Sequence, residues 1–233
     1  MNLLLIDTCG ATGSLALADS TRPLAGATLP GRSAAERLVP AIQSLAASLG
    51  LSLAELDAVA VVHGPGSFTG ERVGLSAAKG LCHALNLPLV AISRLAVLAR
   101  LSGASPAAPV RALLDAGRGE FYSGLYANGL CLHESLLTRD QLLAELGREE
   151  AQLVVCEQIV AQSLAELVPQ LVAEPTAISA LPLALARIQQ RAFDDPASID
   201  ANYLRRSDAE IFAKPIAAAA PQPHPSHSGT PSR

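Results

Sequence analysis

The sequence predicts an α/β protein made of two related halves. Short continuous apolar runs, such as residues 58–62, are typical of strands buried on both faces, and they alternate with segments whose apolar residues recur at helical spacing. A strand, an aspartate, a glycine-rich turn and a returning strand occur around Asp7 and again around Asp115. Half of the 233 residues are apolar, so the chain can bury a substantial core. We therefore expect two similar mixed sheets with packed helices.

Residues 1–104 are expected to form the first half, in the element order βββαβαβα. Pro40 predicts a kink in the first helix, because proline lacks a backbone donor and its ring clashes with the preceding turn. Ser67 follows a Gly-Pro-Gly turn and is expected to cap the second helix. The predicted strands are 3–6, 14–18, 23–29, 58–62 and 87–92, and the predicted helices are 33–50, 67–85 and 93–101.

Residues 105–213 are expected to form a smaller second half, after a flexible boundary at 102–106. The last predicted helix either completes this half or returns to pack on the first. Residues 214–233 are rich in alanine, proline, serine and histidine, and we expect them to be disordered because they cannot bury enough apolar surface. The predicted strands are 110–115, 120–126, 130–136 and 153–156, and the predicted helices are 138–147 and 179–193.

Composition argues against several functional classes. The net charge is −4, aromatic residues make up 3% and no dense basic cluster is visible, so strong unaided binding to nucleic acid is not expected. The four cysteines are far apart, which favours reduced thiols over a disulfide framework or a zinc site. The N-terminal apolar run is too short for a signal peptide, and no run approaches the length of a membrane span. We therefore expect a cytoplasmic protein without membrane contact.

Glycines interrupt the predicted helix at 67–85. Gly70, Gly74 and Gly80 each cost about 1 kcal/mol relative to alanine, so another interaction should offset them. One explanation is a smooth stripe along which the backbone of a second molecule comes close; the other is that the glycines only pack this helix on its own sheet. The stripe would comprise Gly70, Gly74, Ala77, Ala78 and Leu81.

The same stretch resembles the signature of the TsaB (YeaZ-like) family. The resemblance lies in Gly64-Pro65-Gly66-Ser67-Phe68-Thr69-Gly70, in Arg72 and Gly74, and in Ala78-Lys79-Gly80-Leu81. It extends to residues 36–40, to Asp115, Ala116, Arg118, Gly119, Glu120 and Tyr122, and to residues 203–205. Ala34, Ala35 and Gly117 depart from the family pattern, so the polar contacts made at those positions in relatives are not expected here.

The resemblance implies an actin-like (ASKHA, RNase H-like) fold and a role without catalysis by this chain alone. Members of the family are the dimerization subunit of the bacterial machinery that makes N6-threonylcarbamoyladenosine next to the tRNA anticodon. The implied partners are the catalytic paralogue TsaD and the P-loop ATPase TsaE, with a homodimer when the chain is alone and tRNA reached only through the complex. ATP and a divalent metal would be used mainly by the partners, and no cofactor or metal is expected on this chain.

The implied partner interface combines the two helices of the first half. It comprises Leu38, Ile42, Leu45, Gly64, Pro65, Gly66, Ser67, Phe68, Thr69, Gly70, Arg72, Val73, Gly74, Ala77, Ala78 and Leu81.

A degenerate nucleotide cleft is the second candidate site, comprising Asp7, Thr8, Thr12, Asp115 and Arg118. The competing hypothesis is a stand-alone actin-like ATPase, kinase or peptidase acting through Asp7, Asp115 and Ser67. A third is an interaction protein unrelated to tRNA. A P-loop is excluded because Glu71, not lysine, follows Gly70. A metal site is not expected either, because the histidines lack metal-ligand spacing.

Overall fold

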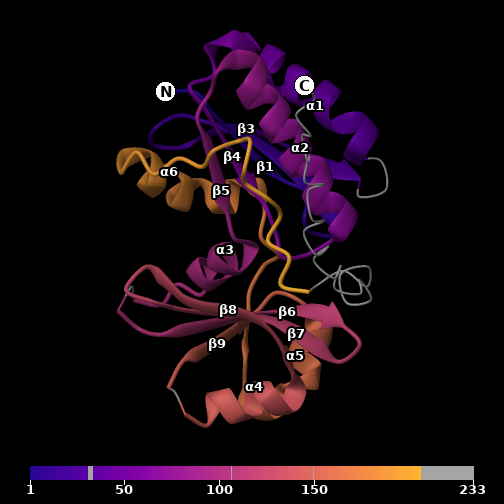
Figure 1. Ribbon diagram of the computed structural model, residues 1–233, viewed down its shortest axis with the longest axis vertical. Coiled ribbons are helices and arrows are strands. Elements are labelled where there is room, and N and C mark those ends of the chain that lie inside the picture. The colour runs from indigo at the N-terminus through magenta and orange to yellow at the C-terminus, as the bar shows by residue number, and fades with distance from the viewer. Residues whose placement is uncertain (31–33, 106, 149, 206–233) are drawn as a thin grey trace, which may run out of the picture.

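The computed structural model shows two α/β units, one above the other (Figure 1), and it describes residues 1–30, 34–105, 107–148 and 150–205. The first half contains a five-stranded sheet of β1 (Leu3–Asp7), β2 (Thr12–Ala18), β3 (Pro23–Pro30), β4 (Ala58–Val62) and β5 (Leu89–Ile92). Its helices are α1 (Ala34–Ser48), α2 (Phe68–Leu85) and α3 (Arg94–Leu101).

The second half repeats this plan. Its sheet is formed by β6 (Val110–Gly117), β7 (Glu120–Ala127), β8 (Leu130–Thr138), β9 (Gln152–Val155) and the short β10 (Gln170–Leu171), and its helices are α4 (Arg139–Leu146) and α5 (Gln158–Ser163). The strand orders are β3-β2-β1-β4-β5 and β8-β7-β6-β9-β10. In each sheet the central strand pairs antiparallel with the next strand and parallel with the fourth, so the predicted duplication is confirmed.

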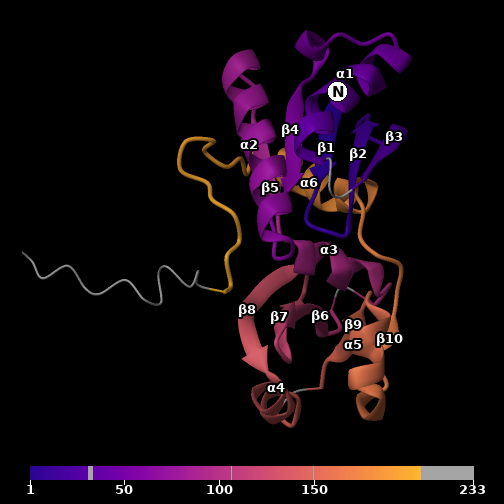
Figure 2. The same cartoon turned by 90° about the vertical axis from the view of Figure 1, so that its right-hand side faces the viewer.

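Four apolar clusters hold the layers together. Helices α1 and α2 cover one face of the first sheet, where Leu38, Ile42 and Leu45 join residues of β1 and β4 in the core. Helix α3 lies between the two sheets and packs on β6 and β7 (Figure 2). Helices α4 and α5 flank the opposite side of the second sheet.

The helix expected at 179–193 is shorter than predicted, and it packs on the first half of the chain instead of completing the second. Helix α6 spans Leu181–Gln189, after a 3-10 turn at Ala177–Ala180. Leu181 and Ala184 pack on the free face of the first sheet, so the chain returns to its first half. The segment after α6 then runs back along α2 towards the second half, where Arg205 pairs with Glu120.

Further local features concern the start of α2, the cysteines and the lengths of the helices. Ser67 caps α2 by accepting a hydrogen bond from the Gly70 amide, as predicted. All four cysteines are free thiols. Among the described residues, every helix is too short or too polar to cross a membrane. The predicted disordered tail lies outside the described residues.

Candidate functional site

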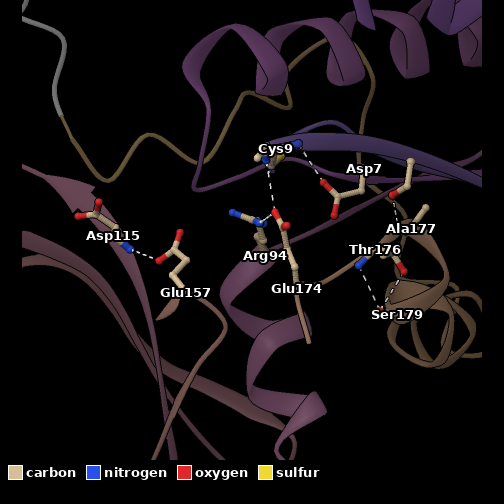
Figure 3. Close-up of polar contacts among 11 residues, drawn as sticks. Asp7, Cys9, Arg94, Asp115, Glu157, Glu174, Thr176, Ala177 and Ser179 are labelled. Carbon is tan, nitrogen blue, oxygen red and sulfur yellow. Dashed lines mark hydrogen bonds and ion pairs between the residues drawn. The ribbon is translucent and has the colours of Figure 1, made fainter. Parts of the chain in front are cut away.

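A cleft of roughly 770 Å³ separates the two halves where the β1–β2 turn faces the end of β6. The β1–β2 turn and the start of α2 form the upper wall, and the β6–β7 region with the end of β9 forms the lower wall. The charged residues that line it are Arg94, Asp115, Glu157 and Glu174, so carboxylates outnumber the single arginine within the described lining. Figure 3 shows how these side chains approach one another.

Asp7, at the end of β1, lies beneath the upper wall of the cleft. Its carboxylate is buried and accepts a 2.9 Å hydrogen bond from the amide of Cys9, which shapes the turn (Figure 3). Burial raises the pKa of Asp7, although the nearby Arg94 guanidinium opposes the shift.

Arg94 is the only cation among the described residues of the cleft wall. It begins α3 directly after the N-cap Ser93 and is only 4% exposed. Its Nη2 atom donates to Glu174 Oε1 at 2.9 Å, and the same oxygen accepts a 3.3 Å hydrogen bond from the Ala11 amide in the β1–β2 turn. The Arg94 Nε atom is buried and has no hydrogen-bond partner among the described residues.

A comparable contact forms on the opposite wall. The amide of Asp115 donates a 2.6 Å hydrogen bond to Glu157 Oε2, while the Asp115 carboxylate accepts from the amide of Gly117. Burial raises the pKa of Glu157. Each hairpin therefore carries a carboxylate of the same chain on one of its amides.

The structure gathers only part of the predicted cleft. Thr8 and Asp115 line it, Asp7 lies behind the wall, and Thr12 is an exposed residue at the start of β2 outside the lining. Arg118 was wrongly included, because it lies at the β6–β7 turn and lines a separate hollow with Arg139 and Arg205. Arg94, Glu157 and Glu174 were missed. Arg94 and Glu174 are 80 residues apart, and no spacing in the sequence relates them.

The glycines of α2 serve close packing within the same chain. A Cβ at Gly70 would lie 1.9 Å from the carbonyl oxygen of Thr8, and a Cβ at Gly74 would lie 2.3 Å from the Thr8 hydroxyl oxygen. A Cβ at Gly66 would lie 2.4 Å from the carbonyl oxygen of Cys9. The second explanation offered above therefore holds for these glycines. Gly80 differs, since a Cβ there would meet nothing within 4 Å.

Burial corrects the proposed partner interface. Many of its residues are buried inside this chain and cannot offer surface to a partner: Leu38, Ile42, Leu45, Gly64, Pro65, Gly74 and Ala78. Others are exposed or half-buried: Gly66, Ser67, Phe68, Thr69, Gly70, Arg72, Val73, Ala77 and Leu81. On α1, Val39 is 46% exposed, and on α2 Phe68 is 47% exposed. The surface of the two helices thus retains apolar side chains outside the core.

Phe68 is part of an aromatic cluster with the returning C-terminal segment. The Arg72 guanidinium lies 3.6 Å above the Phe68 ring centre, and its Nε atom donates a 2.8 Å hydrogen bond to the Tyr203 hydroxyl. The Phe68 and Tyr203 rings are 5.4 Å apart. Lys79 also donates to the carbonyl of Ile199, so the end of the described chain is fixed along α2.

Glu71 is buried in the first turn of α2 instead of facing the cleft. Its carboxyl group lies under the preceding turn, where a Cβ at Gly64 would come within 2.7 Å of Oε1. Burial raises the pKa of Glu71 to about 7, opposed by a hydrogen bond from the Gly66 amide and by Arg94 and Arg72. This acid therefore titrates near neutral pH.

Known proteins resemble the chain over its first half and over its whole fold. The family model described as tRNA N6-adenosine threonylcarbamoyltransferase matches residues 28–131. The tRNA threonylcarbamoyladenosine biosynthesis protein TsaB of Escherichia coli is 36% identical over 130 residues, 54% of this chain and 55% of that protein. The TsaB protein of Bacillus subtilis is 34% identical over 148 residues, 62% of this chain and 64% of that protein. The chain thus spans less than two thirds of these relatives.

A solved structure extends the likeness to nearly the whole described chain. A Pseudomonas aeruginosa protein with similarity to the peptidase YeaZ matches with a TM-score of 0.73 and 29% identity, over 88% of this chain and 99% of that one. With the duplicated strand order, this match confirms the actin-like fold. The sequence and structure matches agree, and the chain is similar to proteins of the TsaB (YeaZ-like) family.

Proposed function

We propose that this chain is a non-catalytic subunit of the machinery that forms N6-threonylcarbamoyladenosine in tRNA. The observation that carries the proposal is its 34–36% identity to two proteins named for the biosynthesis of that nucleoside. The negative net charge and the low aromatic content favour a subunit that meets tRNA only within a larger assembly.

The proposed partner is the larger transferase paralogue, TsaD. The transferase family model covers residues 28–131, which include α1 and α2, so the two proteins share the part of the fold that carries these helices. Two related chains that carry the same helix pair can associate about an approximate two-fold axis, each offering an equivalent surface. In the absence of the paralogue, the same surface would support a homodimer.

The docking face suggested by the structure differs from the glycine stripe of the sequence. It comprises Val39 on α1 and Val73, Ala77 and Gly80 on α2, with Phe68 at one end. Val39 and Phe68 expose apolar surface, whereas Val73 and Ala77 are half-buried at the rim of the core. Gly80 lies one helical turn from Ala77 and has open space around it, so a second backbone can approach there.

The subunit would support the transferase and not act on the substrate itself. ATP and a divalent metal would be used by TsaD and by the small P-loop ATPase TsaE. The stand-alone ATPase, kinase or peptidase hypothesis is weaker, because Asp7 lies behind the cleft wall and the Ser67 hydroxyl is engaged as a helix cap.

Gly80→Leu tests the proposal, with Gly80→Ala as its matched control. Neither change should harm the monomer, since Gly80 is exposed and a Cβ there would meet nothing within 4 Å. We expect Gly80→Ala to co-purify with the paralogue from the native source. We expect Gly80→Leu to bind the paralogue at least about ten-fold more weakly than Gly80→Ala does, since a bulky side chain would separate the helices. Isothermal titration calorimetry with the purified paralogue measures the difference. If both variants bind the paralogue with equal affinity, the proposed docking face is wrong.

A further inference from the structure

The β1–β2 turn holds a carboxylate of its own chain. Glu174 Oε1 accepts hydrogen bonds from the Ala11 amide and from Arg94 Nη2. The contact is tight, because a Cβ at Gly10 would lie 2.4 Å from this oxygen. A backbone amide beside a buried guanidinium is a typical arrangement for binding an anion. Here the anion is supplied by residue 174 (Figure 3).

The facing hairpin is occupied in the same way. Glu157 Oε2 lies 2.6 Å from the Asp115 amide and lines the same cleft as Glu174. The raised pKa of Glu157 indicates that its charge is poorly solvated in this position. Two carboxylates from separate segments of the chain thus cover one amide on each side of the opening.

Arg94 keeps unused capacity to bind an anion. It is 4% exposed, its Nη2 atom is engaged by Glu174, and its Nε atom is the unpartnered donor noted above. A guanidinium can hold a phosphate or carboxylate with two donors, so the one hydrogen bond to Glu174 leaves a donor unused, while the buried Asp7 nearby stabilises the charge of the arginine.

We propose that Glu174 and Glu157 are built-in anions that occupy the anion-binding positions of this cleft and thereby exclude phosphates from the isolated chain. The excluded ligands are small polyanions such as inorganic pyrophosphate, which both the occupied amides and the negative charge of the carboxylates would oppose. Removing the two carboxylates should release the Ala11 and Asp115 amides and Arg94 together, and so create a phosphate site. The isolated chain would exclude phosphates in this way whether or not it has the proposed partner.

The experiment compares pyrophosphate binding by the full chain and by the double variant Glu174→Ala/Glu157→Ala, using isothermal titration calorimetry. We expect no measurable heat with the natural chain, and an affinity of the double variant that is at least about ten-fold above the weakest binding the measurement detects. Amide chemical shifts of Ala11 and Asp115 should move in the double variant on addition of pyrophosphate. Thermal melting checks that the variants fold, and the pair Glu174→Ser/Glu157→Ser, whose shorter side chains also remove the carboxylates, serves if the alanine pair does not fold.

Glu166→Ala is the matched control. Glu166 pairs with Arg139 Nη2 as Glu174 pairs with Arg94 Nη2, and the two side chains are similarly exposed at 52% and 45%, but Glu166 lies outside the cleft lining. It should leave pyrophosphate binding unchanged. The proposal is overturned if the natural chain binds pyrophosphate as tightly as the double variant, if neither folded double variant binds it, or if Glu166→Ala gives the same gain.

Discussion

Gly70 packs its Cα directly on the main chain of Thr8: a Cβ at position 70 would lie 1.9 Å from the Thr8 carbonyl oxygen, and the Thr8 hydroxyl donates a 2.6 Å hydrogen bond to the carbonyl of Gly70. These two contacts join the start of α2 to the end of β1. The glycine motif therefore stabilises the wall of the cleft from inside the chain.

Gly70→Ala and Gly80→Ala should have opposite effects on stability. Because the Thr8 carbonyl is backbone and cannot move aside, we expect Gly70→Ala to lower the free energy of unfolding by about 2–3 kcal/mol. Gly80→Ala adds a methyl group in open space and removes the helix penalty of glycine, so it should raise that free energy by up to about 1 kcal/mol. Urea denaturation followed by circular dichroism measures both. If both variants lost the same free energy of unfolding, Gly70 would not be in closer contact with the rest of the chain than Gly80.

Glu71 should make stability fall as pH rises towards neutrality. Its pKa is about 7 in the folded chain against 4.5 ordinarily, so between these values the folded state holds a proton that the unfolded state has released. The contribution is complete below pH 4.5 and is lost as pH rises through 7, with a size of about 3 kcal/mol at most. Glu71→Gln should lack this loss and be the more stable protein at pH 8 but not at pH 4. The effect would be ruled out if the melting temperatures of the natural chain and of Glu71→Gln changed with pH in the same way.

Arg72 and Tyr203 should be energetically coupled. A double-mutant cycle with Arg72→Ala and Tyr203→Phe removes their 2.8 Å hydrogen bond, and we expect a coupling energy of about 1 kcal/mol. Both single variants should also speed hydrogen exchange at the Asn202 amide, which donates to the carbonyl of His63. Additive effects would show that the aromatic cluster does not fix the C-terminal segment.

Arg94→Leu should destabilise the chain far more than Glu174→Gln. The leucine variant leaves the buried Asp7 without its neighbouring cation, at a cost of about 3 kcal/mol. Glu174 is half-exposed, so neutralising it should cost at most about 1 kcal/mol. Thermal unfolding at pH 7 compares the two. A larger loss in the glutamine variant would mean that Glu174, not Asp7, is the main partner of Arg94.

The sequence was sufficient for those parts of the fold that depend on local patterns. Apolar runs located β1 and β4 because both faces of these strands are buried, and the Gly-Pro-Gly turn with Ser67 located the start of α2. The repeat around Asp7 and Asp115 indicated the duplication. These features arise from neighbouring residues, so one sequence is enough to show them.

The rest depended on contacts between distant segments. Helical spacing placed Gly70 and Gly74 on one side of α2, but it could not show that this side faces Thr8. An apolar helical pattern likewise did not identify which sheet α6 covers. The Glu174–Arg94 pair joins an irregular segment to α3, and nothing in the local sequence of either residue indicates the other.

The return of α6 to the first sheet has a consequence for synthesis on the ribosome. The inner residues Leu3, Leu5 and Val90 remain uncovered until residues 181–189 have left the exit tunnel. The N-terminal half is therefore not a unit that can mature as soon as it is translated, unlike the usual early folding of leading domains. Nascent chains that stop after the second sheet should expose this apolar surface. We expect a ribosome-associated chaperone to bind them.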